Sequence, residues 1–410
     1  MAVKQGYYGA LYLARRTGFD TGSGSGGTIT VSDPSDGHLD FGSNQDFSIE
    51  VWVKGEGTDS TLIEKKGAGT AVGYSLYLGS GRVYFAVYDG STEYYVRSGD
   101  TTINDGKYHH IVGVRDGSAL RLYLDGTEFS DSGYAGSLSN SDDFVVGGGA
   151  DGYTFSLVRV YNTAVSSSQA TSLKNGNLPS ALVEYIVGDW EFTEGAGTTI
   201  YDSSDYKSNG TASSSNGWTT TTYESVSNES VGTGNGSTKE FQLDNSNIDC
   251  DNITITVGGV AKTIDKDYFL SPSGKITFVE APGSGEAIVA SYRYYPVVLE
   301  ITGFHAWSVE ISAETHDITD FTSGGTGARK FVGGLTSWTG SAERWWTYPL
   351  FSAFLQSGGR FIVRFYLDES GGNYLTGWAE VSGITTNVAT DGIVEEPISF
   401  QGVHNITQET

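Results

Sequence analysis

The chain contains 410 residues and carries a formal net charge of -25 at pH 7. This length suits two or three domains, each large enough to bury its own core. The 57 glycines and 25 tyrosines, with few helix-favouring runs, predict an all-β chain with many turns. The acidic composition argues against nucleic acid or an anionic membrane as a ligand, because binding either would require basic patches.

The sequence carries no recognisable targeting or membrane signal. Residues 1–16 contain neither an apolar core of signal-peptide length nor a cleavage-site pattern. No stretch approaches the roughly 18 apolar residues that a membrane span requires. The lone cysteine, Cys250, excludes an intrachain disulfide. We therefore expect synthesis in a cytoplasm and no membrane insertion.

Two flexible stretches divide the chain. Residues Gly6–Ala14 have the pattern of one strand, and the glycine-serine stretch Thr21–Gly27 follows shortly after it. A second polar, low-complexity run covers Ser203–Ser237. These positions indicate that residues 21–225 form an inserted domain with flanking linkers.

The segment between the linkers has the pattern of a β-sandwich. Apolar and polar residues alternate, as in half-buried strands, at Phe47–Val53, Gly73–Leu78, Arg82–Asp89, Tyr108–Val114 and Leu120–Gly126. Turn signals fall about every ten residues, which is typical of two packed antiparallel sheets. A short helix is expected at Ser167–Asn175, with Ser166 as its N-cap and Gly176 as its left-handed stop.

The remainder of the chain includes one long predicted hairpin. In Trp307–Glu314 the apolar residues fall on one face of the strand, and the polar residues, Glu310 and Glu314 among them, fall on the other. This strand is expected to pair with Phe331–Trp345 across the glycine-rich loop Thr322–Ala328. The hairpin should therefore have one apolar and one acidic face.

A single helix is predicted after this hairpin. The apolar residues of Thr347–Gly359 form one stripe, and Pro349 suits the first helical turn. Three strands then close the domain, at Arg360–Glu369, Tyr374–Thr386 and Glu396–Ile406.

Four motifs of the inserted segment resemble the laminin G-like, concanavalin A-type family. These motifs are Phe47–Lys54, Asp105–Gly117, Leu120–Gly126 and Val158–Gln169. The resemblance covers roughly residues 28–190 and implies a jelly-roll β-sandwich. Domains of this family bind sugars, proteins or nothing, so the resemblance fixes no ligand.

The rest of the chain, residues 1–20 and 226–410, resembles the tail tube proteins of long-tailed bacteriophages. The resemblance rests on Met1–Ala14, Ser273–Pro296 and Trp307–Trp346, followed in order by the closing strands. It implies a discontinuous β-sandwich or barrel domain with one helix, into which the lectin-like sandwich is spliced after the first strand. An outward-facing loop accepts such an insertion at little cost, since loop entropy rises slowly with length.

Exposed aromatic rings are the first candidates for a binding site. Sugar rings dock on tyrosine faces, and the tyrosines near the predicted loops are Tyr88, Tyr94, Tyr95 and Tyr153. Alternating tyrosines also serve as cross-strand packing pairs, which is the competing interpretation.

Calcium is the one cofactor that the sequence suggests. The laminin G-like resemblance implies an ion on the sandwich rim, for which the candidate ligands are Asp33, Asp36 and Asp151. The family usually has an acidic residue at the position of Ser156, so this sequence departs from the calcium pattern.

The sequence lacks a catalytic signature, and we expect no enzyme activity. Glycoside hydrolases of this fold need two carboxylates about 5 Å apart on an E-x-D-x-x-E strand, which does not occur here. Glu191 and Glu194 are spaced toward opposite faces of a strand that ends in a turn. His109 and His110 are adjacent, so on a strand they point to opposite faces and cannot bind one ion together.

The tail-tube resemblance implies a structural virion protein, made in the bacterial host cytoplasm. Subunits of that family form stacked hexameric rings, contact other tail proteins, and enclose a lumen through which DNA passes without specific binding. Glu310 and Glu314 are the candidate lumen-lining residues, since a negative wall repels phosphates. The inserted sandwich would then be displayed outside and could bind host-surface glycans weakly at many copies.

The alternative is a carbohydrate-binding adhesin without tube assembly. In that case the C-terminal sandwiches merely hold the lectin-like domain. Images of the purified protein distinguish the two, because an adhesin stays monomeric whereas a tube protein forms rings.

Overall fold

The computed structural model describes residues 11–13, 18–22, 27–69, 71–148, 152–219, 223–297, 299–301, 304–317, 331–345, 360–367, 373–385, 387–388 and 394–409. The chain divides into two compact units. The sandwich unit comprises Arg16–Thr222 and Pro296–Val298. The discontinuous unit comprises Met1–Arg15, Tyr223–Tyr295 and Leu299–Thr410.

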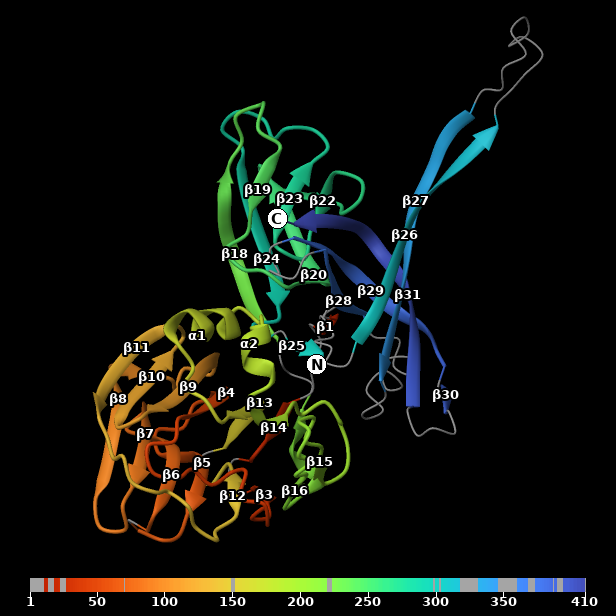
Figure 1. Ribbon diagram of the computed structural model, residues 1–410. Coiled ribbons are helices and arrows are strands. Elements are labelled where there is room, and N and C mark those ends of the chain that lie inside the picture. Colours follow the sequence, from red (N-terminus) through yellow and green to blue (C-terminus); the bar gives the residue numbers. More distant parts are fainter. Residues whose placement is uncertain are drawn as a thin grey trace, which may run out of the picture. The chain divides into compact units, whose positions relative to one another are not determined.

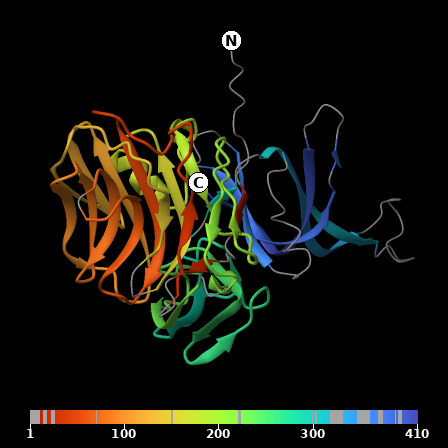
Figure 2. The same ribbon diagram turned by 90° about the horizontal axis from the view of Figure 1, so that it is seen from below.

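The sandwich unit consists of two eight-stranded antiparallel sheets (Figures 1 and 2). The first, here called the β4 sheet, has the order β11 (Thr127–Ser132), β10 (Ala119–Leu124), β9 (Tyr108–Asp116), β4 (Phe47–Gly55), β13 (Tyr153–Tyr161), β2 (Gly18–Asp20) and β17 (Trp218–Thr219), with β14 (Ile186–Trp190) also paired to β13. The second, the β6 sheet, has the order β15 (Thr199–Ile200), β16 (Gly210–Ala212), β3 (Ile29–Val31), β12 (Phe144–Val146), β5 (Ser60–Lys66), β6 (Gly73–Gly79), β7 (Arg82–Tyr88) and β8 (Glu93–Thr102).

Period-two alternation places one face of each strand in the core between these sheets. In β4 the residues Phe47, Ile49 and Val51 are fully buried and belong to the shared core. The opposite face of the β4 sheet is also covered, because Val112 and Tyr161 pack against the segment that carries the helices. The β4 sheet is therefore buried on much of both faces, whereas the outer face of the β6 sheet carries half-buried and exposed side chains such as Tyr77 and Tyr95.

The helix predicted near residue 170 is confirmed. Helix α1 spans Ser167–Lys174, and Ser166 forms a capping box with Gln169. Gly176 follows with φ of 79°, the left-handed conformation that ends a helix. A second helix, α2 (Ser180–Val183), is too short to produce a periodic pattern in the sequence.

The discontinuous unit contains four sheets in its described residues. A six-stranded sheet has the order β26 (Phe304–Asp317), β27 (Phe331–Trp345), β31 (Val394–Glu409), β29 (Tyr374–Ile384) and β28 (Arg360–Tyr366), with β30 (Asn387–Val388) paired to β31. A four-stranded sheet has the order β18 (Glu224–Thr233), β24 (Ala287–Tyr294), β20 (Ile248–Val257) and β21 (Val260–Lys262). A three-stranded sheet has the order β19 (Glu240–Gln242), β23 (Lys275–Phe278) and β22 (Tyr268–Leu270).

A shared core joins the sheets of this unit. Trp378 of β29 packs with the residues of β20 and donates its indole N–H to the Ile248 carbonyl at 2.8 Å. The Arg364 guanidinium donates to Asn247 at 2.8 Å. The predicted long hairpin is present as β26 and β27, which pair from Phe304 to Asp317.

The first described strand belongs to the discontinuous unit. Strand β1 (Leu11–Leu13) pairs antiparallel with β25 (Leu299–Ile301). The chain therefore leaves this unit after its first strand and completes it more than 200 residues later.

The described residues establish an all-β protein with two short α-helices. The helix predicted at Thr347–Gly359 and the loop Thr322–Ala328 lie outside the described residues. The same holds for the part of the predicted strand Gly6–Ala14 beyond β1. No helix within the described ranges is long and apolar enough to cross a membrane.

Candidate functional site

The candidate site is a cavity of about 480 Å³ on the outer face of the β6 sheet. Tyr74 and Leu76 of β6 point into the core, so the intervening Ser75 and Tyr77 point outward. The strand register places Tyr77 opposite Tyr84 and Tyr88 opposite Glu93 on this outer face. We call this cavity the tyrosine groove; the lining residues used below are Asp59, Glu64, Lys66, Ser75, Tyr77, Tyr88 and Glu93.

A hydrogen-bond network fixes the centre of the groove. Oε1 of Glu93 accepts the hydroxyl of Tyr77 at 2.8 Å and that of Tyr88 at 2.9 Å. The Tyr88 hydroxyl also lies 3.1 Å from that of Ser75. Burial, together with the hydrogen bonds to Glu93, raises the pKa of both tyrosines above the usual range. Both therefore remain donors at neutral pH and hold the carboxylate in one orientation.

Aromatic rings form a platform beside this network. The rings of Tyr77 and Tyr84 stack with centroids 4.9 Å apart and planes inclined by 10°. Tyr95 continues the row, 5.3 Å from Tyr84, and is 42% exposed. A row of rings next to fixed carboxylate and hydroxyl groups suits a ligand that has both a C–H face and hydroxyl groups.

The groove is acidic. Its lining includes the carboxylates of Asp59, Glu64 and Glu93 but only one basic side chain, Lys66. The Lys66 ammonium donates to the carbonyls of Gly67 and Gly69 and lies 3.4 Å from Glu64. This cation is thus engaged by the protein itself.

The four tyrosines proposed from the sequence lie in different surroundings. Tyr88 lines the groove, and Tyr95 is exposed on the same face. Tyr94 points to the core side, where it stacks on Tyr134. Tyr153 is 1% exposed within the core and donates its hydroxyl to the Gly57 carbonyl at 2.5 Å.

The sequence interpretation missed Tyr77, Tyr84 and Glu93. The parity of Tyr77 along β6 and of Tyr84 along β7 was legible, since each alternates with apolar residues. Alternation along the strands does not predict which of the two sheets has an exposed outer face.

The rim residues proposed for calcium are held by other side chains. Asp33 accepts a hydrogen bond from the Lys65 ammonium at 2.8 Å. Asp36 pairs with His38 at 2.5 Å, and that hydrogen bond lowers the pKa of Asp36. Asp151 lies outside the described residues. Within the described ranges, no group of three or more His, Cys, Asp or Glu side chains is arranged to hold a metal.

A buried charge cluster lies on the covered face of the β4 sheet. Glu50 lies 3.1 Å from His110 and accepts the Tyr161 hydroxyl at 2.6 Å. Arg159 pairs with Asp189 at 3.0 Å and lies 3.4 Å from Glu50. These side chains are at most 3% exposed, so the cluster ties β14 to the sheet and is closed to a substrate.

The structure also describes the two residue pairs that the sequence analysis considered for metal binding or catalysis, His109 with His110 and Glu191 with Glu194. His110 is fully buried against Glu50, whereas His109 lies between Asp105 and Asp125 at 3.0 and 2.7 Å. Glu191 is buried near Arg159, and Oε2 of Glu194 is buried without a hydrogen bond in the described residues.

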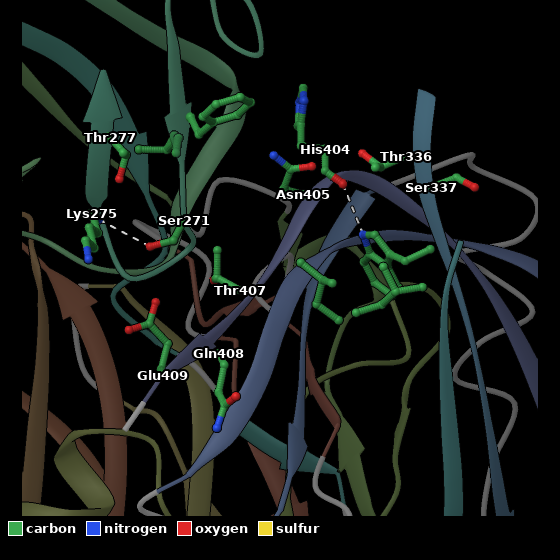
Figure 3. A pocket seen from close by; sticks show the side chains of 15 residues that line it. Ser271, Lys275, Thr277, Thr336, Ser337, His404, Asn405, Thr407, Gln408 and Glu409 are labelled. Carbon is green, nitrogen blue, oxygen red and sulfur yellow. Dashed lines mark hydrogen bonds between the residues drawn. The ribbon is translucent and has the colours of Figure 1, made fainter. Parts of the chain in front are cut away.

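The discontinuous unit has a second cavity, of about 520 Å³ (Figure 3). It lies where the six-stranded sheet splits, because β27 and β31 pair only from Trp345 to Thr339 and then diverge. Trp338 fills the apex of the split and donates its indole N–H to the His404 carbonyl at 3.1 Å. The exposed side chains of Ile311 and Phe269 also line this cavity.

One face of the β26–β27 hairpin is polar from Ser308 to Glu314. Glu310 and Glu314 are exposed. Hydroxyl pairs run along the same face, with Ser308 2.8 Å from Ser341 and Ser312 3.1 Å from Ser337. On the other face Ile311 is 61% exposed.

The comparisons identify the class of the sandwich unit. Residues 23–171 match the Laminin_G_3 family, described as the concanavalin A-like lectin/glucanases superfamily. The sandwich unit therefore has a concanavalin A-like jelly-roll fold. The match does not extend to the discontinuous unit, and no curated protein matches the chain.

Two solved structures illustrate the distant similarity. Domains LG4-5 of the mouse laminin alpha1 chain are 18% identical with a TM-score of 0.29, over 36% of this chain and 41% of that one. The binding domain of botulinum neurotoxin DC, solved in complex with SialylT, is 11% identical with a TM-score of 0.35, over 97% and 89% of the two chains. At these TM-scores the similarity carries no inference about the ligand of this chain.

Proposed function

We propose that the protein binds carbohydrate through the tyrosine groove. The observation that carries this proposal is the ring of Tyr77, which stacks on Tyr84 and lines the cavity beside the fixed carboxylate of Glu93. The tyrosine rings contact the apolar face of a sugar, while the carboxylate accepts its hydroxyl groups.

A glycan array followed by calorimetric titration tests this proposal. Substitution Tyr77→Ala removes half of the stacked pair and should weaken binding by up to about tenfold, since an aromatic contact of this kind contributes about 0.5–1.5 kcal/mol. The control is Tyr201→Ala, which removes another tyrosine of the same unit that is 42% exposed and does not line the groove. Equal affinities of the two variants would refute the site, and an array without any hit would refute the function.

Carbohydrate binding through the groove is compatible with two alternative roles of the whole protein. A carbohydrate-binding adhesin that does not assemble into tubes is the better supported of the two. The family match covers the lectin-like domain and nothing beyond it. Glycan binding by the sandwich unit is sufficient for such an adhesin.

A subunit of a bacteriophage tail tube is the second candidate. Its support is the pairing of β1 with β25 across the inserted unit and the polar face of the hairpin with Glu310 and Glu314. In this role the protein is part of the virion, assembles with itself in hexameric rings and with other tail proteins, and lets DNA pass along the acidic face without binding it. Many displayed sandwich units would then bind host glycans by avidity.

Electron microscopy of the purified full chain separates the two roles. Rings or tubes at high protein concentration support the tail tube, and single particles support the adhesin. Glycan binding is expected in both cases.

A further inference from the structure

We propose that the tyrosine groove selects glycans bearing a free, protonated amine and rejects anionic glycans. This inference rests on the proposed carbohydrate-binding function and adds the class of sugar. Its basis is the arrangement of charged atoms around the tyrosine platform.

The carboxylates of the groove have unused acceptor capacity. Both tyrosine hydroxyls bind Oε1 of Glu93, and Oε2 makes no hydrogen bond within the described part of the chain. Glu64 contacts Lys66 through Oε2, at 3.4 Å, and its Oε1 makes no hydrogen bond there either. Two carboxylate oxygens of residues that line the groove therefore remain for a ligand, and an ammonium group is the strongest donor for them.

The basic side chains do not offset this charge for a ligand. The Lys66 side chain is only 9% exposed, is held by the carbonyls of Gly67 and Gly69, and lies over the Tyr88 ring at 4.7 Å. Arg97 lies on the same outer face opposite Tyr84 but does not line the groove, and its neighbour Arg82 pairs with Asp100 at 2.9 Å. Moving Lys66 toward an anionic sugar would break its existing contacts, so a carboxylated or sulfated glycan meets net repulsion.

The test compares two tetrasaccharides that differ only in the acetyl group: glucosamine tetramer and N-acetylglucosamine tetramer, with sialyllactose as the anionic probe. Titration of the full chain at pH 6 should show the amine form binding about tenfold more tightly than the acetylated form, because a hydrogen bond between charged groups is worth more than a neutral one. Sialyllactose should bind most weakly. The preference for the amine should shrink in about 0.5 M NaCl, which screens the charges.

Two variants assign the effect to the groove. Glu93→Gln keeps an acceptor for the tyrosine hydroxyls and should lower the affinity for the amine tetramer much more than the affinity for the acetylated tetramer, so that the preference for the amine disappears. Glu184→Gln removes an exposed carboxylate elsewhere in the sandwich unit and should leave the preference intact.

The outcomes separate this inference from the function on which it rests. Equal affinity for the two tetramers, or tighter binding of sialyllactose, overturns the selectivity and leaves carbohydrate binding standing. A preference that survives Glu93→Gln also overturns it. Absence of binding to every glycan of the array overturns the proposed function and the selectivity together.

Discussion

The ammonium of Lys65 lies 2.8 Å from the carboxylate of Asp33 on the rim of the sandwich unit. The Lys65 side chain is fully buried and also contacts Asp40 at 3.0 Å and the Asp142 carbonyl at 2.9 Å. Both oxygens of Asn140 lie within 3.4 Å. Carboxylate and carbonyl oxygens are ligands that calcium prefers. Here a side-chain cation occupies the centre of such a set of oxygens.

Calcium should consequently have no effect on the native protein. We expect the same melting temperature in calcium and in a chelator, because the ammonium already neutralises Asp33. In Lys65→Met the carboxylates lose their cation, the unit is destabilised by roughly 3 kcal/mol, and added calcium restores part of this loss. Differential scanning calorimetry of both proteins checks this. A calcium-dependent shift in the wild type would contradict it.

The stability of the sandwich unit should depend on pH through Glu194. Burial raises the pKa of Glu194 from 4.5 to about 7. The folded state therefore binds this proton more tightly than the unfolded state, and the contribution to stability falls as the pH rises from about 4.5 to about 7. Glu194→Gln removes this loss, so its stability relative to wild type should increase by on the order of 2 kcal/mol between pH 5 and pH 8.

Urea unfolding at the two pH values measures this difference. The exposed Glu184 provides the control, since Glu184→Gln should change stability equally at both. If the difference in stability between Glu194→Gln and the wild type is the same at pH 5 and pH 8, the carboxyl group of Glu194 does not titrate between these pH values.

Trp338 packs closely against Gly402, so we expect any larger residue at position 402 to reduce the stability of the discontinuous unit. A Cβ atom at Gly402 would overlap the indole of Trp338, which must remain in place to bond the His404 carbonyl. Gly402→Ala should therefore destabilise the discontinuous unit by about 2 kcal/mol. Gly383→Ala is the matched control, because its Cβ would meet only Ser399 at 3.9 Å. Similar unfolding midpoints for the two variants would contradict the packing argument.

The tail-tube candidate makes its own prediction at Ile311. This residue exposes 61% of its surface on the apolar face of the hairpin, where a neighbouring copy would cover it. If tubes form, Ile311→Asp should abolish them, whereas Ser312→Asp on the polar face should not. Glycan binding should persist in both variants. Micrographs in which both variants assemble normally would exclude Ile311 from the interface.

Local patterns predicted the elements of the sandwich unit well. Alternation located β4, β6 and β7 within two residues, and the cap residue Ser166 located α1. Both signals are encoded by residues adjacent in sequence. The rim and the groove depend on long-range contacts instead. Lys65 meets Asp33 and Asn140 from strands that no local pattern pairs, so the contact of this ammonium with the proposed calcium ligand Asp33 was not foreseeable.

The same distinction explains the groove. Alternation along the strand assigns Tyr77 and the core residue Leu76 to opposite faces of the sheet. It does not predict which of the two sheets has its outer face covered by the helices. Tyr153 alternates in the same way as Tyr88 but points into the core between the two sheets. Exposure of a tyrosine thus depends on which face of its strand the core covers, and long-range packing decides this.

A crystal structure of the full chain with a bound glycan, chosen from the array, tests the central claim most directly. We predict a sugar ring stacked on Tyr77, with its amine or hydroxyl group within hydrogen-bonding distance of Glu93. A sugar bound at the sandwich rim or in the cavity beside Trp338, with the tyrosine groove empty, would contradict it.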